Sequence, residues 1–529
     1  MDRAKFCIAG RCQEIRNLGN RAKTYSRMFM IVAFLVTLGI TLTMNVYMIR
    51  TLREDYQLHD ETGLSVKADG NSSSRFSPVV WIDCEPNQCR HLNHIHTVFQ
   101  QVGFIVVYER KEGLVWDILW SHTYPFDTMR ELSSLHPYQM INHFPGPNSF
   151  KDKYSLASMK MSFHPRAFQL PQQKDSFISF SHNHPDMKWV VKKKTHRHIK
   201  IEYASGIDLD QEGFFVQQFV ENPLLVDGHK FDIGIYAMVT SINPLRVYVI
   251  DDDALVRFCP EQYYPFDASV VEKYVVVPHY KTLWEMPSLK DLYLNEGFNF
   301  KTALNQHLIG RGIDVDKVWA DMISALREVF HESEAYLLQH AAELKFLNTD
   351  HFAELVRFDF IVDANLKVYM MEANESPNFS TYQYIKNVRL YKHVLYNYLS
   401  LVGWTQYASR ERADHKEVMR VSSREVRVFL DECSAPVCEA SCVWLECRLC
   451  RRCVWSETHK TLRKAYLEHK RRKSARRIVP PPIDEARARL WNPATEWPFD
   501  DVNANMSESN KLMHRWFIGM CRRDASFCY

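Results

Sequence analysis

The pattern of apolar and polar residues around position 360 predicts a β-hairpin. Apolar side chains occupy every second position of its first run, at Val356, Phe358, Phe360 and Val362. A second run, Leu366 to Glu372, follows the turn, and a period of two is typical of strands. A two-residue loop at 364–365 would place Asp359 opposite Met370. Glu372 would then lie diagonally beside Asp359, on the same face of the hairpin.

The same periodicities predict further elements along the chain. Val79 to Asp83 is expected to form a buried strand, His94 to Val102 a helix, and Phe104 to Tyr108 a second strand, which together indicate a small α/β domain. Residues 314 to 344 carry apolar side chains at three- and four-residue spacing and predict a long amphipathic helix. Another helix is expected from about Ile385 to Leu401.

An uncharged apolar stretch, residues 28–49, predicts a membrane-spanning helix rather than a cleaved signal peptide. The basic tail before it, residues 1–27, contains seven Lys or Arg and two acids, so the positive-inside rule places the N-terminus in the cytosol. Residues 50–77 form a polar stem on the far side. We therefore expect a single-pass membrane protein of type II, with a cytosolic-facing catalytic domain as the alternative.

Length and composition fit an enzyme-sized region with appendages. The chain has 529 residues, 46% of them hydrophobic, which is enough for an extensive core and more than one compact unit. The net charge of +3 carries little information, because basic residues cluster. One such cluster, Lys460 to Arg477, is interpreted either as a surface for an acidic protein tail or anionic lipid, or as a solvated basic helix. We expect no nucleic-acid partner.

Cysteines concentrate near the end of the chain. Eight of the 13 lie in the last part, at Cys433, Cys438, Cys442, Cys447, Cys450, Cys453, Cys521 and Cys528. A dense, even-numbered cluster is typical of disulfides formed in an oxidising lumen. The spacing of Cys447, Cys450 and Cys453 keeps a zinc site open as the alternative.

Three side chains on one face of the predicted hairpin indicate a metal site. Asp359, Glu372 and Asn374 supply two carboxylates and a carboxamide, which are oxygen donors suited to Mg²⁺. The alternative is a solvated sheet face that carries two acids. The sequence Glu-x-Asn followed by Ser376 and Pro377 is the rarer feature and favours the metal site.

Together with motifs upstream, this stretch resembles the tubulin–tyrosine ligase-like family of ATP-grasp amino-acid ligases. The upstream motifs are WDILWSH at 116–122, INHFPG at 141–146, FQLP at 168–171 and WVVK at 189–192. The resemblance covers residues 78–404 and implies an α+β chain with an ATP-grasp fold and a small N-terminal α/β domain, preceded here by one transmembrane helix. Residues 405–529 form a further cysteine-rich and basic region.

The resemblance also implies roles for individual residues. The nucleotide-binding positions that it implies are Lys192, Gln217, Gln218, Val220, Lys230 and Asp232. Gln217 would lie beside the adenine, with backbone groups of Gln218 and Val220 on its edge. Arg257 and Lys230 would steady phosphate charge during catalysis. Asp359, Glu372 and Asn374 would hold Mg²⁺.

Two departures from the family pattern bear on catalysis. The family carries an arginine at the position of Gly234, and phosphoryl transfer relies on positioned cations. Arg246 and Arg257 are the candidates to replace it. The segment Lys193 to Ile199 lacks the glycines of the family's phosphate loop but contains several basic residues that can supply charge instead.

The expected function is ATP-dependent addition of glutamate to glutamate side chains of an acidic protein acceptor, with tubulin as the first candidate. The LVRF and ENESP stretches, with the basic tail, favour this polyglutamylase branch. A tyrosine or glycine ligase of the same family is one alternative. The other is a membrane-anchored pseudo-ligase that binds a nucleotide or a partner without catalysis, which Gly234 favours and the three metal ligands oppose.

Overall fold

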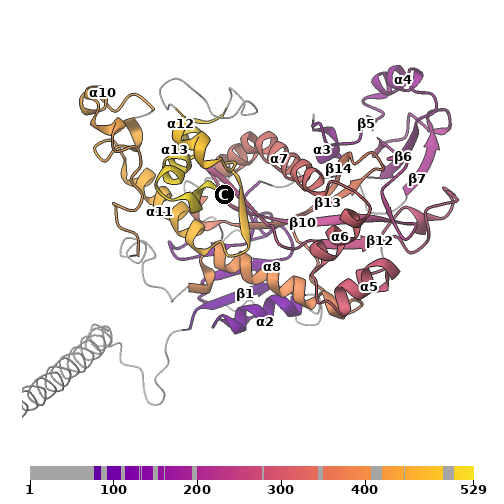
Figure 1. Cartoon of the computed structure of the whole chain (residues 1–529), viewed down its shortest axis with the longest axis horizontal. Coiled ribbons are helices and arrows are strands. Elements are labelled where there is room, and N and C mark those ends of the chain that lie inside the picture. The colour runs from indigo at the N-terminus through magenta and orange to yellow at the C-terminus, as the bar shows by residue number, and fades with distance from the viewer. Residues whose placement is uncertain are drawn as a thin grey trace, which may run out of the picture. The chain divides into compact units, whose positions relative to one another are not determined.

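The computed structural model describes thirteen parts of the chain between Ser77 and Tyr529 (Figure 1). They are residues 77–84, 92–108, 113–129, 132, 134–146, 153–159, 161–193, 199–276, 279–343, 349–406, 420–445, 447–491 and 506–529. All belong to the second of two compact units, Met1–Ser74 and Arg75–Tyr529. The predicted span at 28–49 lies outside the described residues. Within those residues, no helix has the length and apolar character needed to cross a membrane.

The first sheet is parallel and confirms the predicted strand–helix–strand unit. Its strands are β1 (Val79–Asp83), β2 (Ile105–Val107), β3 (Ile118–Ser121) and β4 (Met140–Ile141), in the order β2-β1-β3-β4. Helix α2 (Asn93–Gln101) makes the crossover from β1 to β2 that a parallel pair requires. It buries Ile95, Val98 and Phe99 and packs beside α8 (Val388–Leu401) (Figure 1).

The second sheet is antiparallel and has one apolar face. It contains β5 (Ala167–Leu170), β6 (Lys188–Lys193), β7 (Ile199–Tyr203) and β8 (Phe214–Gln218), in the order β5-β8-β6-β7. Phe168 and Trp189 pack on that face against Phe177 of α4 (Lys174–His182). Because side chains alternate along a strand, Val190 and Lys192 of β6 face the opposite side.

The third sheet, antiparallel and seven-stranded, is the centre of the fold. Its strands are β9 (Leu225–Val226), β10 (His229–Ile242), β11 (Leu245–Ile250), β12 (Leu255–Phe258), β13 (Glu354–Val362), β14 (Val368–Asn374) and β15 (Ala475–Val479). The order is β14-β13-β10-β11-β15, and β9 and β12 also pair with β10. All 14 residues of β10 are buried.

The predicted hairpin is present as β13 and β14, but its register differs from the prediction. The loop is longer than two residues, because Asp363 caps it by accepting hydrogen bonds from the backbone N–H groups of Asn365 and Lys367. A bulge then shifts the pairing, so that Asp359 lies directly opposite Glu372 rather than opposite Met370. Asp359 and Glu372 still lie on the same face of the hairpin, as predicted.

The predicted long helices are confirmed. Helix α7 (Val315–Glu343) packs its apolar face into the main core, and α8 follows a short 3₁₀ turn at Ile385–Asn387. The remaining α-helices are α3 (Lys153–Ser158), α5 (Pro287–Leu294), α6 (Phe300–Gly310), α10 (Pro436–Ala440), α11 (Ser456–Arg471), α12 (Glu485–Leu490) and α13 (Glu508–Arg523). The described residues thus form an α+β structure.

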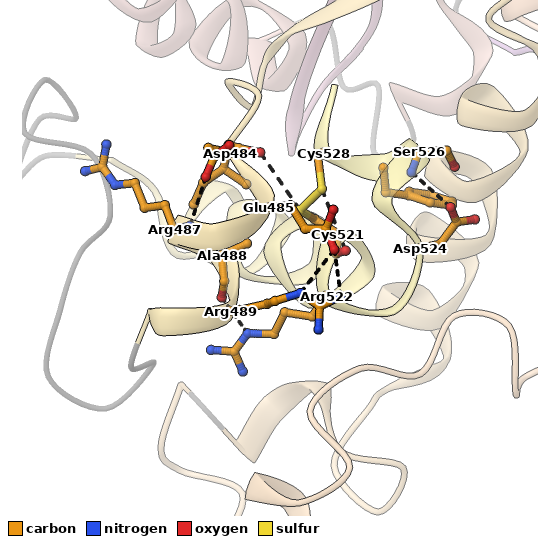
Figure 2. Close-up of a disulfide and its surroundings, with 12 residues drawn as sticks. Asp484, Glu485, Arg487, Ala488, Arg489, Cys521, Arg522, Asp524, Ser526 and Cys528 are labelled. Atoms are coloured by element: carbon orange, nitrogen blue, oxygen red, sulfur yellow. Dashed lines mark hydrogen bonds and ion pairs between the residues drawn. A yellow bond between two sulfur atoms is a disulfide. The ribbon is translucent and has the colours of Figure 1, made fainter.

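The cysteine-rich region contains disulfides, as its spacing favoured. The pairs are Cys433–Cys450, Cys438–Cys447, Cys442–Cys453 and Cys521–Cys528. The three sulfurs that zinc would have needed, at Cys447, Cys450 and Cys453, are therefore all occupied. Figure 2 shows the last pair, which joins the end of α13 to the chain terminus, next to Arg522, whose Nε donates to the Ala488 carbonyl of α12.

The basic run, Lys460 to Arg477, packs one side into the fold, whereas Lys470 and Lys473 are exposed. Helix α11 buries Leu462, Ala465 and Leu467, and β15 follows it and pairs with β11 of the central sheet. Glu468 of α11 accepts two hydrogen bonds from the buried Arg246 of β11, at 2.8 and 2.9 Å. The last strand of the central sheet is therefore supplied by the chain's C-terminal region.

Candidate active site

A cavity of about 760 Å³ is lined by residues of both the second sheet and the central sheet. This volume is within the range of pockets that hold a small-molecule ligand. Nine of the ten predicted site residues line it: Lys192, Gln218, Val220, Lys230, Asp232, Arg257, Asp359, Glu372 and Asn374. Gln217 does not line it directly, but its side-chain oxygen accepts a hydrogen bond from Lys192 at 2.7 Å.

Two lysines from different sheets bring positive charge to one part of the cavity. Lys192, at the end of β6, is surrounded by protein, and burial lowers the pKa of its ammonium group to about 8, with nearby Lys153 acting in the same direction. Lys230, near the start of β10, donates to the Tyr274 carbonyl at 3.2 Å, and burial lowers its pKa as well. Both ammonium groups have room for an anionic partner, which would restore their ordinary pKa values.

An alternating row of four charges lines the cavity over the central sheet. Arg257 of β12 donates to both carboxylate oxygens of Asp232, at 2.8 Å each, and to Asp359 at 2.9 Å. Arg357 of β13 donates to both oxygens of Asp359, at 2.7 and 2.9 Å. The strand register produces this row, because Asp232 pairs with Arg257 and Gly234 pairs with Asp359.

The two aspartates of this row differ electrostatically. Burial raises the pKa of Asp232, and Arg257 opposes that rise. Burial would also raise the pKa of Asp359, yet Arg357 and Arg257 together hold it below its usual value. Asp359 therefore stays ionised, as a metal ligand must.

The three predicted metal ligands have donor atoms that fit Mg²⁺. Asn374 donates its Nδ2 to Asp359 Oδ2 at 3.1 Å, which leaves its own carbonyl oxygen without a hydrogen bond from any described residue. Glu372 is a third exposed, and one of its oxygens lies 3.3 Å from the Lys153 ammonium. From the described residues, Asp359 Oδ1 accepts one hydrogen bond, from Arg357, and it retains a lone pair. Among the described residues, no group of three His, Cys, Asp or Glu side chains could hold a metal, and the predicted set here combines two carboxylates with the Asn374 amide.

Arg257 and Arg246, the two candidates to replace the family's arginine at position 234, lie in different places. Arg257 lines the cavity. Arg246 does not: it is buried in the central sheet, where Glu468 neutralises it. The central part of the segment expected to replace the phosphate loop, residues 194–198, lies outside the described residues.

Sequence reasoning missed two charged residues of the cavity. Arg357 precedes Asp359 by two positions on the same strand, so strand alternation could have placed both side chains on one face. Lys153 enters from α3, and no motif surrounds it in the sequence. Its position beside Glu372 depends on long-range packing, which local patterns do not encode.

Comparison with known proteins supports the resemblance. The model of the tubulin-tyrosine ligase family matches residues 130–412. A probable tubulin polyglutamylase of Caenorhabditis elegans, ttll-15, is 37% identical over 454 residues, which are 83% of this chain and 84% of that protein. A probable beta-tubulin polyglutamylase of Tetrahymena thermophila is 28% identical over 58% of this chain and 28% of its own length. A tubulin polyglutamylase of Danio rerio, ttll6, is 27% identical over 60% of this chain and 42% of its own length.

The matched segment contains the cavity and every predicted site residue, from Lys192 to Asn374. The match to the worm protein extends over most of both chains, so the likeness is not confined to a few motifs. The chain therefore belongs to the tubulin-tyrosine ligase family, whose members are ATP-dependent ligases.

Proposed function

We propose that the cavity binds Mg-ATP in an ATP-grasp arrangement, between the second sheet and the central sheet. The observation that carries this proposal is the meeting of three cations and three oxygen ligands in one cavity. Lys192, Lys230 and Arg257 offer positive charge for phosphates. Asp359, Glu372 and Asn374 offer oxygens for Mg²⁺, whose charge would further offset that of the phosphates.

The adenine would lie toward the end of β8. Gln218 and Val220 line the cavity there, with the apolar Phe219 between them. Backbone N–H and C=O groups along an extended segment can hydrogen-bond a base edge while apolar side chains cover its faces. Gln217 would act indirectly, because its side chain holds the Lys192 ammonium group in place.

We propose glutamylation as the reaction. A carboxylate of the acceptor protein attacks the terminal phosphorus of ATP, the bond to the bridging oxygen breaks, and ADP leaves with that electron pair. The amino nitrogen of free glutamate then attacks the acyl carbon of the resulting acyl phosphate. Inorganic phosphate leaves and the nitrogen loses a proton, which completes an amide bond. The cavity's cations would offset the charge that spreads over the phosphate oxygens during the first step.

The proposed acceptor is an acidic protein tail, and tubulin is the candidate that the names of the relatives suggest. The test is ATP-dependent transfer of labelled glutamate to purified tubulin by the full-length chain in detergent. Glu372→Gln removes a metal-ligand charge and keeps the side-chain shape, so incorporation should fall about 10- to 100-fold. Transfer that is unchanged in this variant would contradict the metal assignment. No transfer by the parent protein, with ATP bound, would favour nucleotide-dependent binding without catalysis.

A lumenal orientation would require another acidic acceptor than tubulin, and for the orientation we propose that the described region faces an oxidising lumen, as in a type II protein. Four disulfides in the described residues support this, since disulfides persist in oxidising compartments. The basic tail before residues 28–49 supports it independently. In this orientation the acceptor would be an acidic protein of the secretory pathway; cytosolic tubulin requires the opposite orientation.

A further inference from the structure

The glycine at position 234 is explained by space rather than by backbone conformation. Its φ angle lies outside the left-handed region that favours glycine. A Cβ atom built there would lie 2.8 Å from Cδ and 3.3 Å from Cγ of Arg357, and 3.1 Å from Oδ1 of Asp359. Contacts below 3.0 Å force a neighbour to move. The arginine at 357 therefore occupies the space that any side chain at 234 would need.

The two positions lie next to each other on paired strands. Gly234 pairs with Asp359, and Tyr236 pairs with Arg357. Directly paired residues of an antiparallel sheet share a face, so positions 234 and 357 are diagonal neighbours on the cavity side. A long side chain rooted at either position can reach the Asp359 carboxylate.

Arg357 also retains a donor for a ligand. Its Nε and one terminal nitrogen donate to Asp359, while the other terminal nitrogen, Nη1, has no hydrogen-bond partner among the described residues. Arg357 Nη1 is absent from the set of polar atoms that are both buried and unpartnered, so it is accessible. Arg357 also lines the cavity. Asp359, which Arg257 also contacts, fixes the Arg357 guanidinium plane from one side, and this orients the remaining N–H groups in advance of binding.

We propose that Arg357 binds the terminal phosphate of ATP and supplies the cation that is absent at position 234. This inference rests on the proposed binding of ATP to the cavity. Arg357 and Gly234 then form one exchanged pair: the charge has moved from β10 to the adjacent strand β13, and the glycine on β10 makes room for it. Arg257 remains the second cation, so the cavity keeps two guanidinium groups over the central sheet.

A purely structural role for Arg357 makes a different prediction. If Arg357 only neutralised the buried Asp359, its loss would disturb the metal ligands and would weaken the binding of ATP and of ADP to the same extent. If Arg357 contacts the terminal phosphate, its loss weakens the binding of ATP alone, because ADP lacks that group. The ratio of the two affinities therefore separates the two roles without any measurement of turnover.

The experiment measures the affinities of the full-length chain in detergent for ATP and ADP, each with Mg²⁺, by calorimetry. Arg357→Ala should weaken the binding of ATP about 10- to 100-fold, which is the range for one charge-assisted hydrogen-bonded contact. It should change the affinity for ADP little. The exchange variant Gly234→Arg with Arg357→Gly should recover most of the loss, because the new side chain reaches the same carboxylate. Gly234→Arg alone should not help, since Arg357 still fills the space. Arg476→Ala is the matched control, because this arginine of β15 pairs with Asp251 outside the cavity.

An unchanged ATP-to-ADP ratio in folded Arg357→Ala would overturn the inference while leaving nucleotide binding intact. If Arg357→Ala does not fold, the exchange variant decides. If the exchange variant has the same ratio of ATP affinity to ADP affinity as the parent protein, the inference is supported. If the exchange variant has lost the parent's preference for ATP, the inference is overturned. Failure of the parent protein to bind either nucleotide would instead overturn the proposed function, and the inference with it.

Discussion

The ammonium group of Lys192 lies where a positive charge is costly until an anion arrives. Burial and the neighbouring Lys153 lower its pKa to about 8, so the protonated fraction falls as pH rises through that value. A bound phosphate favours the protonated form and raises the pKa again. Nucleotide binding above pH 8 must therefore bring a proton with it.

We expect up to about one proton to be taken up per ATP at pH 8.5 to 9, and little uptake at pH 7, where Lys192 is already charged. Calorimetry in buffers of different ionisation enthalpy measures this number directly. Lys192→Arg is the matched control, because a guanidinium group stays charged throughout this range, so this variant should lose the part of the uptake that Lys192 contributes. Equal uptake by the parent and this variant would assign the proton to another group.

The residue scale also shows where sequence reasoning succeeded. Strand alternation and the Glu-x-Asn motif are local, so the sequence could place Asp359, Glu372 and Asn374 together, and all three line the cavity; their role as metal ligands stays a prediction. Gly234 was recognised as a departure, but its cause was not visible. That cause is a contact between two strands whose residues are more than one hundred positions apart, and only the register brings Arg357 over Gly234.

At the scale of elements, helices and strands were predicted well where their periodicity was strong, as in α7 and the β13–β14 hairpin. The register of the hairpin was not predicted, because a bulge depends on packing across the sheet and on a loop capped by the Asp363 side chain. The attachment of β15 was also not foreseen. Its sequence, ARRIV, overlaps a basic run, and its pairing with β11 depends on long-range tertiary contacts.

The buried pair of Arg246 and Glu468 links β11 to α11 and makes a quantitative prediction. Glu468→Ala leaves the Arg246 guanidinium buried and unpaired, and breaking such a pair costs about 3–5 kcal/mol of unfolding free energy. Urea denaturation measures this loss. Asp321→Ala, which removes the partly exposed partner of Lys317 on α7, is the control and should cost less than about 1 kcal/mol. Similar losses in both variants would mean that Glu468 does not hold the C-terminal region to the sheet.

At the scale of the whole molecule, the proposed type II orientation predicts which acceptors are accessible. Intact microsomes treated with protease should protect a C-terminal tag, and Asn71, in an Asn-Ser-Ser acceptor pattern, should carry sugar. Added detergent should make the tag sensitive and is the control for the protease itself. A tag that is digested without detergent, with Asn71 unmodified, would place the ligase in the cytosol with tubulin.

The pairing of β15 with β11 has a consequence for biosynthesis. The ribosome completes residues from the N-terminus, so Leu245–Ile250 emerges long before Ala475–Val479, its neighbour in the finished sheet. Until then, an apolar strand edge with open N–H and C=O groups has no partner, and such edges invite pairing with other chains. The central sheet is therefore completed only after Val479 has been synthesised, and a message cut short before that codon encodes a chain in which this edge of β11 stays unpaired.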